Sequence, residues 1–126
     1  MVEVATVLIA VNDTVLADSL RFSLELEGYA AKLCRLPFDP AENAAPNACL
    51  LLDQDVFATM VRAGDGEAIH RLGMPTVLMV NQRTRRIMDH ARAAGISSVL
   101  EKPLLGGILF DTIRMVLEAD GAIGKK

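Results

Sequence analysis

The sequence predicts a three-layer α/β domain built on one parallel sheet, and three observations support this fold class. Short apolar runs without alternation, at 7–11, 48–52 and 76–80, are typical of strands that are buried on both faces. Segments in which apolar residues recur at helical spacing separate these runs. Glycine and proline mark the points where one kind of segment ends and the next begins. Such alternation indicates right-handed crossovers that cover both faces of the sheet with helices.

The first third of the chain contains two of the predicted strands. The apolar run 7–11 is followed by Asp13, a good N-cap for a helix that continues to Glu27. Gly28 ends this helix as a C′ glycine, and residues 29–34 form a short strand that we expect at an edge of the sheet.

The middle of the chain is restricted by proline. Pro37, Pro40 and Pro46 leave room only for a short helix between Pro40 and Pro46. The buried strand 48–52 follows, and the glycines of 64–66 indicate a loop.

The remaining elements alternate between helix and strand up to a polar tail at 119–126. We expect helices at 67–72, 83–94 and 104–119, and strands at 76–80 and 96–100. Residues 1–126 are predicted to form a single domain, since the length is close to the usual domain size.

Composition excludes several classes of protein. Hydrophobic residues make up 52% of the chain, yet no apolar run approaches the roughly 18 residues that a membrane span needs. The first residues include Glu3 and no basic cluster, so they do not resemble a secretory signal. The net charge of -3 argues against direct nucleic-acid binding, which normally needs a basic face. Cys34 and Cys49 lack metal-ligand spacing and indicate buried thiols in a reducing cytoplasm.

Polar residues follow three of the predicted strands. Asn12 and Asp13 follow the first, Asp53 and Asp55 the third, and Lys102 the fifth. Ligand sites of open α/β sheets lie at the carboxyl ends of the strands. If these ends meet, clustered carboxylates need a cation, and Mg²⁺ suits Asn12, Asp13, Asp53 and Asp55 as a weak set of ligands. Asp53 beside Lys102 and a metal is a plausible nucleophile for a phosphoryl group. Ordinary turn residues and loop ion pairs would explain each position separately.

Four motifs carry a resemblance over almost the whole chain. They are VLIAVNDTVLADSLRFSLELEGY, ACLLLD, MPTVLMV and ARAAGISSVLEKPL. In order, they resemble the first strand and helix, the acceptor strand, the fourth strand and the fifth strand of the receiver domain of bacterial two-component response regulators. The resemblance implies a flavodoxin-like, doubly wound (βα)5 sheet with strand order 2-1-3-4-5, which is the usual order in this family.

The resemblance also implies roles for individual residues. Asp53 matches the phosphoacceptor, Lys102 matches the lysine that contacts the phosphoryl group, and a cis bond is implied between Lys102 and Pro103. The implied role is signalling rather than catalysis of an independent reaction. A histidine kinase or a phosphotransfer protein would be the partner.

The match fails at other functional positions. The acidic pair of the family falls on Val11 and Asn12, the switch Thr or Ser on Val80, and the aromatic switch residue on Val99. Losing two carboxylates should weaken a Mg²⁺ site by several kcal/mol, because each charge pair contributes roughly 4 kcal/mol at 4 Å in partly shielded surroundings. We therefore expect a degenerate receiver that acts largely through protein–protein interaction. A fully phosphorylatable, Mg²⁺-dependent receiver is the alternative, and a small-molecule-binding α/β domain is a third hypothesis.

Two surfaces could bind partners. Arg83, Arg85, Arg86, Arg92 and His90 gather on the fourth helix, as a solvated face or as a docking surface for an acidic partner or a phosphorylated nucleotide.

The last helix has a second candidate surface. Ile108 and Met115 lie outside its core-facing stripe, which indicates either coverage by the polar tail or a homodimer formed through the fourth and fifth helices.

Overall fold

A single five-stranded parallel sheet forms the centre of the computed structural model, which describes residues 4–39, 46–71 and 73–119. The strands are β1 (Thr6–Ala10), β2 (Ala30–Leu33), β3 (Ala48–Asp53), β4 (Thr76–Val80) and β5 (Ser98–Glu101). Their order is β2-β1-β3-β4-β5, and every neighbouring pair is parallel. The fold class and the strand order that the sequence and its resemblance implied are therefore confirmed.

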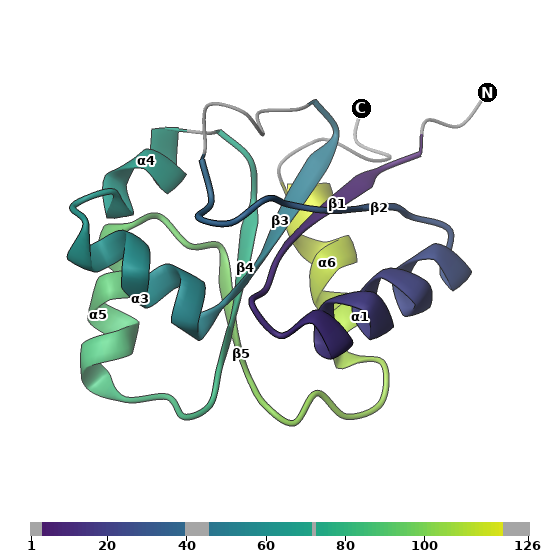
Figure 1. Ribbon diagram of the computed structural model, residues 1–126. Coiled ribbons are helices and arrows are strands. Elements are labelled where there is room, and N and C mark those ends of the chain that lie inside the picture. Colours follow the sequence, from purple (N-terminus) through teal and green to yellow (C-terminus); the bar gives the residue numbers. More distant parts are fainter. Residues whose placement is uncertain (1–3, 40–45, 72, 120–126) are drawn as a thin grey trace.

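Helices cover both faces of this sheet (Figure 1). They are α1 (Thr14–Leu26), α3 (Gln54–Arg62), α4 (Gly66–Arg71), α5 (Arg85–Ala93) and α6 (Ile108–Ala119). Helices α1 and α6 pack on one face, and α3, α4 and α5 pack on the other. The short helix expected between Pro40 and Pro46 and nearly all of the polar tail lie outside the described residues.

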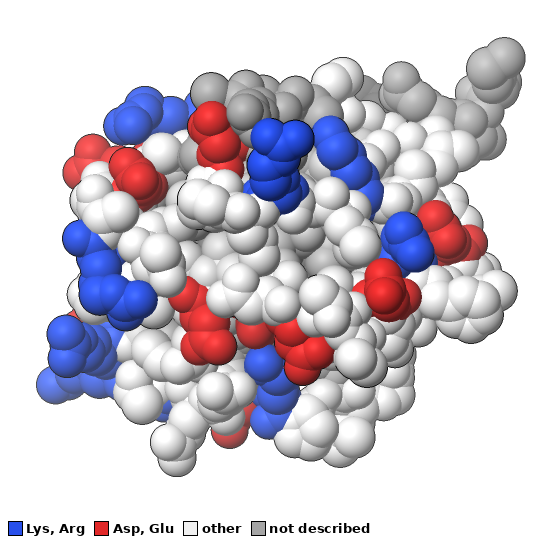
Figure 2. All heavy atoms as spheres, viewed as in Figure 1, with Lys and Arg blue, Asp and Glu red and all other residues white. Residues whose placement is uncertain are grey.

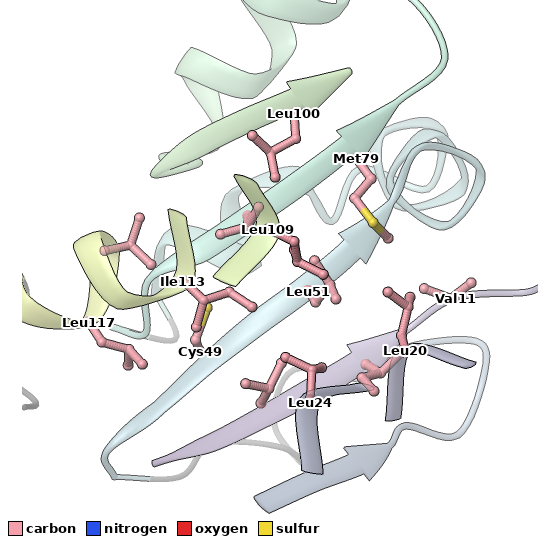
Figure 3. Packing of buried hydrophobic residues seen from close by; sticks show 14 of the residues in the cluster. Val11, Leu20, Leu24, Cys49, Leu51, Met79, Leu100, Leu109, Ile113 and Leu117 are labelled. Atoms are coloured by element: carbon pink, nitrogen blue, oxygen red, sulfur yellow. The ribbon is translucent and has the colours of Figure 1, made fainter. Parts of the chain in front are cut away.

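Alternate residues of the strands supply two separate cores. Ile9 and Leu51 point to the α1 and α6 side, where Figure 3 shows Leu51 with Leu24, Ile113 and other buried residues. The residues between them in the chain, such as Leu50 and Leu52, join the core beneath α3, α4 and α5. All six residues of β3 are buried, because β3 is the central strand and has helices on both faces.

Local sequence signals explain how α1 begins and ends. Asp13 caps its first turn, since the backbone N–H of Leu16 donates to Oδ1 of Asp13 over 3.1 Å. Gly28 follows the helix with a φ of 98°, and the N–H of Tyr29 donates to the carbonyl of Leu24 over 3.1 Å. This six-to-one bond is characteristic of a Schellman motif. Both ends of the helix were predicted from the sequence.

The expected start of the final helix was wrong. The helix was expected from Leu104, but α6 begins at Ile108, after Gly106 with a φ of 61° and Gly107. Two successive glycines favour an irregular backbone over a helix, because glycine loses the most conformational freedom when a helix forms. From the sequence, no helix was assigned to residues 54–62 and only the loop at 64–66 was expected, but residues 54–62 form helix α3.

Other boundaries differ from the expected ones by one or two residues. Helix α5 begins at Arg85 rather than at residue 83, because the hydroxyl of Thr84 caps it by accepting from the N–H of Ile87. Among the described helices, none is long and apolar enough to cross a membrane.

Candidate functional site

The carboxyl end of β3 places Asp53 in the centre of one edge of the sheet. Asp53 pairs in register with Met79 of β4, and β1 lies on the other side of β3. Its side chain is only 7% exposed, although it carries a carboxylate. A buried carboxylate is costly unless it has a charged or hydrogen-bonding partner, so its neighbours determine what this site can do.

Lys102 is the charged partner of Asp53. It directly follows β5, where its backbone N–H donates to the carbonyl of Val80 over 2.8 Å. Its Nζ lies 2.9 Å from Oδ1 of Asp53, and its side chain is 28% exposed. The same Oδ1 is buried and accepts no hydrogen bond of good geometry among the described residues. The contact is therefore a close charge pair rather than a directed hydrogen bond. The peptide bond between Lys102 and Pro103 is cis, as the resemblance implied.

The end of β1, by contrast, supplies no carboxylate to this charge pair. Val11 is buried in the core on the α1 side, and Asn12 is exposed. Asp13 is exposed as well, and its Oδ1 is used as the N-cap of α1. Asp55 lies exposed in the first turn of α3. Within the described ranges, no three His, Cys, Asp or Glu side chains gather as a metal site would require.

These positions fit a resident Mg²⁺ ion poorly. A small dication prefers several oxygen ligands in near-octahedral geometry, and usually includes one or two carboxylates. Here Asp53 is the one buried carboxylate among the described residues, and an ammonium group already lies against it. The other two carboxylates of the predicted ligand set, Asp13 and Asp55, are exposed, and Asp13 has a structural role. The structure thus brings Asp53 and Lys102 together but does not assemble the predicted ligand set around them.

The two positions that resemble the family's switch residues are aliphatic and packed. Val80 is fully buried at the end of β4, and Val99 is half-buried in β5 against the same core. The carbonyl of Val99 accepts a hydrogen bond from Nη2 of Arg83 over 2.7 Å. Neither valine has a hydroxyl that could bond a phosphoryl oxygen or a hydrogen-bonding aromatic tip.

Sequence reasoning missed one hydrogen bond near the candidate site, which involves Gln54. This residue follows Asp53, and its Oε1 accepts a hydrogen bond from the backbone N–H of Asn81 over 2.7 Å. The bond joins the first residue of α3 to the loop after β4, beside the Asp53–Lys102 pair. No local signal marks it, because a glutamine in the first turn of a helix is usually an ordinary solvent-exposed residue.

The two cysteines form no disulfide within the described residues. Cys49 is buried in β3, and Cys34 is partly buried beyond β2. Burial raises the pKa of the Cys34 thiol to about 11, so this thiol stays protonated at neutral pH. Both cysteines pack among apolar residues, Cys49 in the core beneath α1 and α6 and Cys34 against the core on the other face.

Comparison with solved structures identifies the fold. The chain is similar to a CheY-like response regulator receiver domain from Methanospirillum hungatei JF-1, with a TM-score of 0.72, 18% identity, and coverage of 94% of this chain and 98% of that one. It is similar to a two-component response regulator from Clostridium difficile, with a TM-score of 0.73, 20% identity, and coverage of 90% and 96%. It is also similar to the chemotaxis protein CheY4 of Vibrio cholerae, with a TM-score of 0.64, 16% identity, and coverage of 90% and 99%. The sequence matches no protein-family model and no curated protein. The chain therefore has the fold of response regulator receiver domains.

Proposed function

We propose that the protein is a degenerate receiver module of a two-component phosphorelay, with Asp53 as its nominal acceptor, and that it acts largely through protein–protein contacts. One observation carries the proposal. The acceptor carboxylate is neutralised by Lys102 at 2.9 Å, whereas the neighbouring end of β1 offers Val11 and Asn12 in place of acids. Phosphoryl transfer depends mainly on positioning and on neutralising the developing charge. Without a well-built cation site, Asp53 should react slowly.

A fully phosphorylatable receiver is the second candidate, and the same charge pair favours it. In that case an oxygen of Asp53 attacks the phosphorus atom of a donor, an acyl phosphate forms, and the leaving group departs with the electrons of the broken bond. Lys102 would then balance negative charge on the phosphoryl oxygens. The two candidates share the acceptor and differ in whether the remaining side chains suffice for transfer.

Both candidates imply a partner rather than an independent enzymatic reaction. The partner that delivers the signal would be a histidine kinase or a phosphotransfer protein. A homodimer through α5 and α6 is a further element of the proposal, because Ile108 and Met115 remain 49% and 65% exposed on α6. Exposed apolar side chains on one helix favour a contact surface when they lie together.

The experiment is phosphorylation of the purified protein by a small phosphodonor with Mg²⁺, read at once by intact mass. We expect no gain of one phosphoryl mass, or a gain far below stoichiometric. Asp53→Asn is the control, because it keeps the size of the side chain and removes the nucleophile. A stoichiometric gain that is absent from Asp53→Asn would contradict the degenerate receiver and establish the second candidate.

A further inference from the structure

A groove between α3 and α5 lies on the face of the sheet that carries neither α1 nor α6. It encloses about 270 Å³. Half-buried apolar side chains line it from both helices, namely Ala58 and Val61 of α3 and Ile87 of α5. Arg62, at the end of α3, and Arg86, on α5, complete the lining from opposite sides. The groove therefore combines an apolar interior with a basic rim.

The rim has an unbalanced positive charge. No acidic side chain lines the groove, and His90 is its third basic residue. Arg86 makes no ion pair or side-chain hydrogen bond within the described residues, and Arg62 donates only to the hydroxyl of Thr59, over 3.3 Å. The single acid of α5, Asp89, is paired with Arg92 at 3.4 Å.

Basic side chains also gather over α5, at the lower left of Figure 2, where few acidic side chains are visible. This local excess of positive charge occurs in a chain of net charge -3. It is therefore a feature of this surface and not of the average composition.

We propose that this groove binds an acidic amphipathic segment of a partner protein. Its apolar side chains would lie between α3 and α5, and its carboxylates would pair with Arg62 and Arg86. An amphipathic helix in an apolar groove is a recurring mode of peptide recognition, and arginine is enriched at such interfaces. A nucleic-acid partner fits less well, because the groove offers no exposed Phe, Tyr or Trp for base stacking: Phe57, the one such residue in its lining, is buried.

The groove reaches the candidate acceptor through one residue. Gln54 lines the groove and directly follows Asp53 in the chain. Its Oε1 also accepts a hydrogen bond from the backbone N–H of Asn81 over 2.7 Å. A bound segment would therefore contact the residue next to the acceptor. The inference rests on the proposed role in protein contacts, but its test does not involve phosphorylation of Asp53, so either proposal can fail alone.

The test is a binding titration with one defined probe. The probe is a fluorescent helical peptide of about 14 residues, with leucines at i, i+3, i+4 and i+7 and glutamates on both flanks. We expect saturable binding, with a dissociation constant below about 1 mM, measured by fluorescence anisotropy. Amide shifts of isotope-labelled protein should change along α3 and α5. Arg62→Ala and Arg86→Ala should each weaken binding about two- to fivefold, as for exposed charge pairs.

Arg92→Ala is the matched control. It removes one positive charge, as Arg86→Ala does, and from the same helix, but Arg92 pairs with Asp89 and does not line the groove. We expect it to change the dissociation constant less than about twofold, and circular dichroism should show that all three variants fold. Equal losses in all three variants would show nonspecific attraction and overturn the proposal.

Three further outcomes would overturn it. One is the absence of saturable binding. Another is equal binding of a peptide in which serines replace the leucines, since this would show that the apolar interior has no role. The third is tighter binding of a short single-stranded oligonucleotide that shifts the same amides, because it would identify a nucleic-acid surface instead.

Discussion

The two sides of Asp53 differ sharply, although both lie at one edge of the same sheet. On the β5 side, Lys102 contacts the carboxylate at 2.9 Å and follows a strand whose backbone is paired with β4. On the β1 side, Val11 packs into the core and Asp13 caps α1. On each side, the local backbone determines the role of these side chains: Lys102 is positioned by β5, and Asp13 is used by the first turn of α1. The buried carboxylate therefore has a protein cation as its charged partner, and the end of β1 contributes no acid to that pair.

Restoring acids to the β1 side should have the largest effect. We expect the double variant Val11→Asp/Asn12→Asp to lose about 2–4 kcal/mol of unfolding free energy without Mg²⁺. Val11 is buried, and it follows Ala10, which pairs with Leu52, the residue before Asp53, so a new carboxylate would be desolvated on the strand next to Asp53. Mg²⁺ should return part of the loss, about 2.7 kcal/mol at a concentration one hundred times the dissociation constant. Urea denaturation with and without Mg²⁺ measures both changes.

The native chain and Val11→Asn are the controls for this variant. Neither adds a charge at the end of β1, so Mg²⁺ should leave the unfolding free energy of both nearly unchanged. If Mg²⁺ stabilises the native protein as much as the double variant, then the β1 side already completes a metal site, and the contrast between the two sides is wrong.

Removing the cation on the other side should have the next largest effect. Lys102→Ala leaves the Asp53 carboxylate buried without its partner, and we expect a loss of about 1–3 kcal/mol of unfolding free energy. The double variant Lys102→Ala/Asp53→Asn should be more stable than Lys102→Ala alone, because it also removes the buried carboxylate that would have no charged partner. Chemical denaturation of the native protein, Lys102→Ala, Asp53→Asn and the double variant completes a double-mutant cycle, which measures the coupling energy between Asp53 and Lys102. Additive losses would mean that the pair has no energetic role.

The sheet and the positions of Asp53 and Lys102 could be predicted because they depend on backbone patterns. The apolar runs of β1, β3 and β4 specify strands buried on both faces, and in a parallel sheet the ends of β3 and β5 lie at one edge. Because Asp53 ends β3 and Lys102 follows β5, the two residues were expected at the same edge of the sheet. The N-cap at Asp13 could also be predicted, because it involves only a local side chain and the first turn of a helix.

The rest depends on side-chain directions that a sequence does not encode locally. Asp13 was named in two predictions, as a helix cap and as a weak metal ligand, and in the structure its Oδ1 accepts the capping hydrogen bond. The bond from Asn81 to Gln54 joins residues 27 positions apart, and neither has a distinctive neighbourhood in the sequence. The groove between α3 and α5 likewise appears only when two helices are placed side by side.

The smallest expected effect concerns Asp13, on the β1 side. If this carboxylate is a helix cap, Asp13→Ala should lose about 1 kcal/mol of unfolding free energy, equally with and without Mg²⁺. Thr84→Ala is the matched variant, because Thr84 caps α5 with the same bond length of 3.1 Å and lies on another loop. Thermal and urea unfolding of the two variants should give losses of similar size. A loss for Asp13→Ala that appears only when Mg²⁺ is present would instead identify Asp13 as a ligand, because a cap interacts with backbone N–H groups whether or not a cation is bound.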